Sequence, residues 1–288
     1  MRTIRAQCTF LVATVILAAC SSGNVEHHGR GLAPDPVVHR GGEDVVFRID
    51  TRGGFTSLEN QLGIVPELSI FGDGRVVVSG PVTEQYPPHA LPNLLTGRLA
   101  QATVAALATR AIGLDLLRPM DFGRPGVTDM PTTTVTLNVD GHHELKAYAA
   151  DFTVVPRDPG VSSVALDARR RLSRFTQALT DAANRVATQP FAAPEVAVHA
   201  RPIEQSAGDT SGIAPNSIEW PFGDLATLGT RPDGTVELAY RCAALTGSDS
   251  NRALAAARDA TSITRWLSHA VEYSIVWRPL LPAEHGCP

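Results

Sequence analysis

Alternating apolar and polar residues predict that much of the chain forms β-strands. At 134–139, threonine and asparagine alternate with valine and leucine, as in a strand with one exposed and one buried face. Asp-Gly pairs at 73–74, 140–141 and 233–234 are typical of tight hairpin turns, which need a positive φ. Further strands are expected at 45–49, 67–71, 75–78, 195–200, 235–242 and 272–278.

Amphipathic helices are predicted where apolar residues recur at steps of three and four. The first such stretch covers 98–112, with Gly113 as its stop. The second covers 161–186, with a stripe of Val161, Val164, Ala168, Leu172, Phe175, Leu179, Ala182 and Val186. A shorter helix, capped at 248–250, should run to about residue 260. We therefore expect an α+β fold, in which antiparallel hairpins pack against amphipathic helices in two units of similar size.

Changes in composition divide the chain into four parts. Two prolines in a short interval mark a boundary near residue 190, and Pro279 and Pro282 are expected to end regular structure. The segment after the leader is rich in Gly, Pro and His, which favours a flexible linker. The predicted parts are a signal peptide at 1–19, a tether at 20–43, an α+β domain at 44–190 and a smaller α+β domain at 191–288.

The leader has the pattern of an export signal. Arg2 and Arg5 precede an apolar run at 10–19, which is about half of the ~20 residues that a membrane-spanning helix needs. The run ends in Leu17-Ala18-Ala19-Cys20, which resembles the lipobox of bacterial lipoproteins. This resemblance implies that Cys20 receives acyl chains, such as palmitate, and anchors the protein to the outer face of the cell membrane. An ordinary secretory signal with a chance cysteine is the alternative.

The remaining cysteines predict one disulfide. Cys8 leaves with the signal and Cys20 carries lipid, so Cys242 and Cys287 are left in an oxidising compartment. Closing a 45-residue separation would stabilise the fold by about 4 kcal/mol in the loop-entropy model. There is no C-x-x-C pair, which argues against a redox-active site.

The charge balance argues against nucleic acid as a partner. The formal net charge is −4, and removal of the leader, which carries +2, leaves a chain near −6. Proteins that neutralise phosphates along a nucleic acid need a basic surface.

The segment at 120–134 is the candidate binding loop. It is shaped by Pro and Gly and contains Asp121, Arg124 and Asp129. Loops on a rigid scaffold often carry binding groups. The two aspartates could act as acid and base only if the loop brings them together, and a structured connection with capping aspartates is the simpler interpretation. We predict no catalytic residue, cofactor or metal, because the chain has no Gly-rich phosphate loop, nucleophile elbow or zinc-protease motif.

The histidines are interpreted as solvated linker and turn-surface residues, with loose transition-metal binding by those of the tether as the alternative. His27, His28 and His39 fall in the tether, and His142-His143 follow a turn, where adjacent strand residues face opposite ways. Trp220, Trp266 and Trp277 are interpreted as core residues, with a binding groove as the alternative.

A run of arginines on the second helix is interpreted as a solvated face. It consists of Arg169, Arg170, Arg171 and Arg174. The alternative is contact with anionic headgroups or phosphorylated glycans near the membrane.

Several short motifs resemble a family of actinobacterial secreted lipoproteins of unknown function. They are the lipobox with Cys20, Gly53-Gly54-Phe55, Gly72-Asp73-Gly74, Asp121-Phe122-Gly123 with Thr128-Asp129, and Arg278-Pro279-Leu280-Leu281-Pro282 through Glu284 to Cys287. The similarity runs over most of the chain after the leader. Since no activity is attached to the family, the resemblance implies no catalytic residue.

These observations favour a non-enzymatic binding or interaction module of the cell envelope. Its expected partners are membrane lipid, through the acyl anchor, and an envelope protein or glycan. A cell-envelope hydrolase that uses carboxylates of the 120–134 loop is the alternative.

The anchor can be tested by substitution. Cys20→Ser should release the protein from the membrane fraction or block its processing, because the substituted side chain cannot form the lipid thioether. Cell fractionation and the mass of the N-terminal peptide measure this. Unchanged membrane retention together with an unchanged mass would contradict the prediction.

Overall fold

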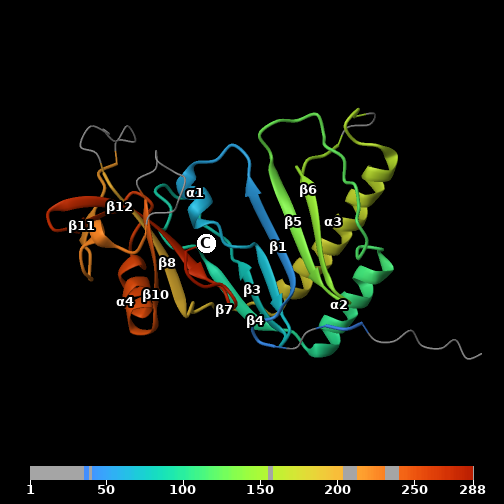
Figure 1. Ribbon diagram of the computed structural model, residues 1–288, viewed down its shortest axis with the longest axis horizontal. Helices are drawn as coiled ribbons and strands as arrows, with labels where there is room; N and C mark the ends of the chain where they lie inside the picture. The colour runs from blue at the N-terminus through green and yellow to red at the C-terminus, as the bar shows by residue number, and fades with distance from the viewer. Residues whose placement is uncertain (1–35, 39–40, 155–157, 204–212, 231–239, 288) are drawn as a thin grey trace, which may run out of the picture. The chain divides into compact units, whose positions relative to one another are not determined.

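The computed structural model describes residues 36–38, 41–154, 158–203, 213–230 and 240–287 (Figure 1). All of them fall within one compact unit, Asp35–Pro288. The predicted signal peptide, Cys20, His27, His28, His39, the Asp233-Gly234 turn and residues 235–239 of a predicted strand lie outside the described residues.

Seven described strands form the first sheet, each antiparallel to its neighbours. In sheet order they are β6 (His142–Tyr148), β5 (Pro131–Asn138), β1 (Val45–Gly53), β2 (Leu68–Phe71), β3 (Arg75–Ser79), β4 (Leu94–Arg98) and β7 (Gln189–Pro190). The predicted turns at 73–74 and 140–141 are confirmed, since Gly74, Asp140 and Gly141 have φ of 86°, 49° and 130°. The strands β4 and β7 were not predicted.

Helices α2 (Gln101–Gly113) and α3 (Ser163–Asn184) pack side by side on the first sheet and share its core (Figure 1). The first helix starts at Gln101 and not at Arg98, because Arg98 pairs with β3 as the end of β4. Val164 was expected on the buried stripe but is 72% exposed. Ala165 is buried instead, and its N–H donates to Ser162 Oγ, which caps the start of α3.

The second sheet has the order β10 (Arg241–Thr246), β8 (Glu195–Pro202), β12 (Val271–Leu280), β11 (Arg265–Ser268) and β9 (Ser217–Glu219). It is accompanied by α4 (Gly247–Ala257) and a 3-10 turn at Leu225–Thr227. Two separate sheets with packed helices confirm the α+β class. One pair of this sheet is not antiparallel, since β9 runs parallel to β11.

Two predicted boundaries in this half are wrong. The helix α4 begins at Gly247 after Thr246, so Ser250 is buried inside it and does not cap it. Pro279 does not end β12 but pairs with Val196. A proline is tolerated there because β11 pairs only with residues 271–273, so β12 has a partner strand on one side only at Pro279.

The second core is built around the three tryptophans. Trp266 and Trp277 have ring centroids 5.2 Å apart, and Trp220 lies 6.0 Å from each. All three are buried, which confirms their interpretation as core residues.

Chain segments from each half contribute to the other half. The helix α1 (Leu58–Gly63) packs against β12, and Ala90 N donates to Ala260 O at 2.9 Å. In the opposite direction, Leu281 packs with Phe71 of the first sheet and its neighbours. The two sheets are therefore joined by packing as well as by the connection after β7.

A partly buried charge cluster also joins the two sheets. Glu284 Oε2 lies 3.1 Å from Arg278 Nη2 of β12, and Glu284 Oε1 lies 3.4 Å from Arg48 Nη1 of β1. Arg278 Nε donates to Ile64 O at 2.8 Å, and its side chain is 3% exposed. Burial lowers the pKa of Arg48, while the attraction of Glu284 opposes that effect. One carboxylate thus compensates two guanidiniums from different sheets.

The disulfide Cys242–Cys287 is confirmed, with the Cα atoms 6.1 Å apart. It fixes the segment that carries Glu284. Cys242 Sγ lies 3.9 Å from Nε2 of His199, which is 1% exposed. Burial, aided by Arg278, lowers the pKa of His199 from 6.5 to about 4.

The attached part of the chain begins before the predicted domain start at residue 44. Val37 N donates to Asp140 Oδ1 at 2.8 Å, and Val38 forms an isolated bridge with Val139. Arg75 Nη2 also donates to Gly42 O. The described end of the predicted tether is therefore bound to the first sheet. No helix among the described residues combines the length and apolar character that a membrane span requires.

Because Glu284 pairs with both Arg48 and Arg278, we expect its substitution to destabilise the protein strongly. Glu284→Gln should lower the free energy of unfolding by about 3 kcal/mol, because it removes the paired carboxylate from the buried guanidinium of Arg278 and leaves Arg48 with only the attraction of Asp50. Glu144→Gln is the control, since Glu144 pairs with Lys146 on an exposed surface and its loss should cost under about 1 kcal/mol. Denaturant titration measures both. Equal effects would contradict the assignment.

The lowered pKa of His199 predicts that the free energy of unfolding depends on pH. The unfolded chain binds a proton as the pH falls below 6.5, whereas native His199 stays neutral down to about pH 4. The free energy of unfolding should therefore decrease from pH 6.5 to 4, by up to about 3 kcal/mol from this group. His199→Gln should remove that part of the slope and His142→Gln, at an exposed site, should keep it. Identical slopes in wild type and His199→Gln would refute the prediction.

Candidate functional site

A cavity of about 330 Å³ lies between α3 and the first sheet. Its apolar part is formed by Ile49, Ala147, Ala150 and Leu172. Its polar part is formed by Glu67, Thr133, Asp151, Arg169, Ser173, Thr176, Gln177, Thr180 and Asp181. An apolar wall with several convergent polar groups is the usual composition of a small-molecule site, and the volume is at the lower end of the usual range.

The secondary structure determines which side chains reach the cavity. On α3, Ser173, Thr176 and Thr180 follow one another at steps of three and four, so their hydroxyl groups form a polar stripe beside the buried Leu172. On β5, Thr133 is one of the few buried polar residues, and its hydroxyl lies 2.9 Å from that of Thr51 on β1. The cavity thus has hydroxyl groups on the helix side and on the sheet side.

Arg169 connects the cavity to the candidate loop at 120–134. Its guanidinium donates to three backbone oxygens, those of Phe122 at 3.1 Å, Tyr148 at 2.9 Å and Ala149. Burial lowers its pKa, and Asp158 counteracts this. Arg169 was predicted to belong to an exposed basic run, but it is 8% exposed. Because carbonyl oxygens occupy its donors, Arg169 holds the loop and one wall of the cavity together.

Tyr148 holds the rest of the loop. Its hydroxyl donates to Val127 O at 2.8 Å and accepts from Met130 N at 3.2 Å. The guanidinium of Arg124 lies 4.1 Å from the centre of the Tyr148 ring, a favourable cation–π distance. The loop is therefore a structured connection anchored to the end of β6.

The two loop aspartates serve local backbone structure. Asp121 Oδ1 accepts from Gly123 N at 2.8 Å, as a turn-capping carboxylate does. Asp129 has a φ of 58°, and its carbonyl oxygen accepts from Phe55 N. No hydrogen bond or ion pair among the described residues joins the two carboxylates. Asp121, Arg124 and Asp129 do not line the cavity.

The charge of the cavity is negative. Glu67, Asp151 and Asp181 contribute three carboxylates to its wall, whereas Arg169 contributes one guanidinium, whose two Nη atoms already donate to backbone oxygens. Anionic groups are therefore disfavoured in the cavity, and amino or hydroxyl groups are favoured.

The other candidate residues stay apart from the cavity. His142 Nδ1 lies 2.7 Å from Asn138 Oδ1, and His143 Nε2 lies 3.2 Å from Val139 O, so both interact with the β5–β6 turn. Within the part of the chain that the structure describes, no group of three His, Cys, Asp or Glu side chains could hold a metal ion.

Sequence patterns did not reveal the cavity. Arg169 was grouped with the arginines that follow it, but its spacing of four residues from Ala165 and three from Leu172 places it on the buried side of α3. The serine and threonine stripe on α3 was a usable signal, since hydroxyl residues at helical spacing beside an apolar stripe indicate a polar zone against the core.

No protein-family model, no curated protein and no solved structure matches the chain.

Proposed function

We propose that the protein is a lipid-anchored binding module of the cell envelope that holds a small neutral or cationic ligand under α3. The observation that carries this proposal is the cavity of about 330 Å³, with its apolar wall, hydroxyl groups and three carboxylates.

The location rests on the leader. The basic start, the short apolar run and the Leu-Ala-Ala-Cys ending at Cys20 support export and acylation. More than one acyl chain is needed for stable anchoring, because a single chain binds a membrane only marginally. The disulfide agrees with an oxidising compartment outside the cytoplasm.

The ligand class follows from the lining groups. A ligand of monosaccharide size with hydroxyl or amino groups can donate to the carboxylates and exchange hydrogen bonds with Ser173, Thr176 and Thr133. Its C–H face can pack on Leu172 and Ile49. The hydrolase alternative lacks comparable support, because Asp121 caps its own turn and no contact among the described residues links it with a second catalytic group.

Ligand preference tests this proposal with three sugars of similar size. Glucosamine is cationic, glucose is neutral and glucuronate is anionic. We expect glucosamine to bind about tenfold more tightly than glucose, which corresponds to roughly 1.4 kcal/mol of charge attraction, and glucuronate not to bind. Chemical-shift titration of cavity residues measures the affinities. Asp151→Asn should reduce the preference for glucosamine.

A matched pair of variants locates the binding. Ser173→Trp should block the cavity, since Ser173 is on its rim, whereas Ser163→Trp places the same side chain on the same helix outside the cavity. Retained binding in Ser173→Trp, or no shift of any cavity residue with any of the three sugars, would contradict the proposed ligand site.

A further inference from the structure

The arginine run on α3 does not form one uniform basic surface. Arg169 is buried against backbone oxygens. Arg171 pairs with Asp167 at 3.0 Å and with Asp115 at 3.6 Å. Arg174, in contrast, remains exposed on the side of α3 that faces α2.

Arg174 lines a groove of about 560 Å³ between α2 and α3. Arg110 of α2 and Arg185 line the same groove, and Asp181 is the one acid among its lining residues. Its apolar lining is formed by Ala106, Leu107, Ala178 and Ala182. The helical spacing of 174, 178, 181 and 185 places these α3 residues on one face. Three positive charges and one negative charge therefore meet over a narrow apolar strip.

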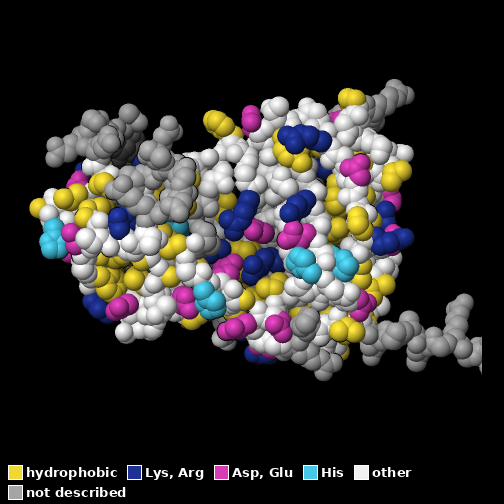
Figure 2. All heavy atoms as spheres, in the orientation of Figure 1, with side chains coloured by type: hydrophobic (Ala, Val, Ile, Leu, Met, Phe, Trp, Pro, Cys, Tyr) yellow, Lys and Arg dark blue, Asp and Glu magenta, His cyan; other side chains and the backbone are white. Residues whose placement is uncertain are grey.

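The three guanidiniums of this groove are free to bind an external anion. Arg110, Arg174 and Arg185 are exposed, and no side-chain hydrogen bond or ion pair to another described residue is found for any of them. Some other surface arginines differ, because Arg52 pairs with Asp50 and Arg118 with Asp115. On the face that Figure 2 shows, several basic side chains lie beside acidic ones. The groove is thus distinguished by unbalanced positive charge.

The two helices run antiparallel, which places the Arg185 end of the groove near the start of α2. Arg171 Nη1 donates to Leu114 O just after α2. At the other end, Gly97 just before α2 lies against Val186, where a Cβ would be 2.0 Å from the carbonyl oxygen. The helix ends are therefore fixed by contacts with Leu114 and Gly97.

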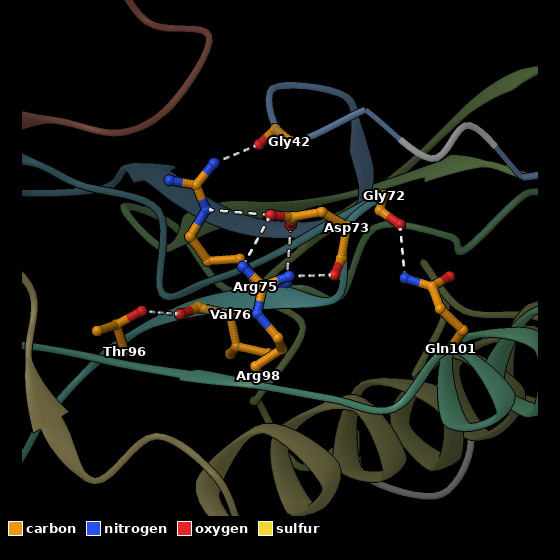
Figure 3. A network of polar contacts seen from close by, with 8 residues as sticks. All are labelled: Gly42, Gly72, Asp73, Arg75, Val76, Thr96, Arg98 and Gln101. Atoms are coloured by element: carbon orange, nitrogen blue, oxygen red, sulfur yellow. Dashed lines mark hydrogen bonds and ion pairs between the residues drawn. The ribbon is translucent and has the colours of Figure 1, made fainter.

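The same end of the sheet receives the chain from the predicted anchor. Figure 3 shows that Arg98 contacts Asp73, that Arg75 contacts Gly42 and that Gln101 contacts Gly72. These contacts tie residue 42, the β2–β3 turn and the start of α2 together. Cys20 lies 17 residues before the attached Val37, a separation that spans at most about 60 Å when fully extended. An anchored chain would therefore keep this groove within reach of the membrane surface.

We propose that the α2–α3 groove binds the phosphate headgroup of an anionic phospholipid in the membrane to which the protein is tethered. Guanidinium groups bind phosphate oxygens in a bidentate manner, and the apolar strip at Leu107, Ala178 and Ala182 fits the glycerol and first methylene groups. The groove differs in sign from the cavity, although both include Gln177 and Asp181. This inference rests on the proposed envelope location for the source of the phospholipid.

Vesicle flotation tests the proposal without the acyl anchor. Every described element lies within the compact unit Asp35–Pro288, so the chain from residue 20 onward with Cys20→Ser is a suitable protein. We expect it to bind vesicles of phosphatidylglycerol with phosphatidylcholine and not vesicles of phosphatidylcholine alone. Replacing Arg110, Arg174 and Arg185 by Gln should weaken binding by about fivefold for each arginine and about 100-fold together, and added salt should weaken it further.

A control of equal charge change separates the groove from general attraction. The control is the triple variant Arg52→Gln, Arg118→Gln, Arg258→Gln, which also removes three positive charges but at exposed sites outside the groove. It should reduce binding far less. Equal loss in the two triple variants, or equal binding to neutral vesicles, would overturn the proposal. Calorimetric binding of inorganic phosphate that depends on the three groove arginines, without vesicle binding, would overturn the lipid assignment. This vesicle test involves neither acylation of Cys20 nor the cavity under α3. Its failure is therefore distinguishable from failure of the proposed function.

Discussion

The attraction between Glu284 and two guanidiniums, those of Arg48 and Arg278, connects the first sheet to the second. Isolated charges in a protein interior are costly, and the Glu284 carboxylate offsets that cost for Arg278 and, together with Asp50, for Arg48. The carboxylate is in turn held by the local turn at Leu281, whose N–H donates to Glu284 Oε2 at 3.0 Å, and by the disulfide at Cys287. The disulfide thus holds the C-terminal segment in place, and that segment positions the Glu284 carboxylate. The carboxylate in turn connects the two sheets.

Helix α3 relates this architecture to the proposed binding sites. One side of α3 completes the core with Leu172, Phe175 and Leu179. The residues that flank this apolar stripe line the acidic cavity on the sheet side and the basic groove on the α2 side. The two hollows can differ in sign, although they adjoin, because Arg169 is turned inward to backbone oxygens whereas Arg174 is turned outward. A single helix therefore presents two chemically distinct surfaces next to a rigid core.

The local features of the fold could be predicted from the sequence, whereas the long-range features could not. The turns at 73–74 and 140–141, the alternation in β5 and the length of α3 follow from backbone preferences and periodicity. The strands β4 and β9 are short and gain their pairing from neighbours distant in sequence. The disulfide could be inferred because only two cysteines were left to pair. In contrast, Glu284 has no neighbour in sequence that indicates its two partners, which lie 236 and 6 residues away.

The candidate site shows the same contrast between predictable local features and unpredictable long-range ones. Asp121, Arg124 and Asp129 were noticed because Pro and Gly make their segment conspicuous, yet those residues organise the loop and leave the cavity to α3. The cavity and the groove depend on which face of a helix meets a sheet or a second helix, and periodicity alone does not identify the opposing surface. Arg169 lies four residues after Ala165 and three before Leu172, on the buried side of α3, and there it takes a structural role, whereas Arg174 lies off that side and stays free.

Unfolding followed by two regional probes tests the central claim that the two sheets form one cooperative structure. The three tryptophans all lie in the second core, so their fluorescence reports on that half, and amide exchange in β1 and β5 reports on the first sheet. With the disulfide intact, the two probes should give one coincident transition in denaturant. Separate transitions for the tryptophans and for the β1 and β5 amides would contradict the account.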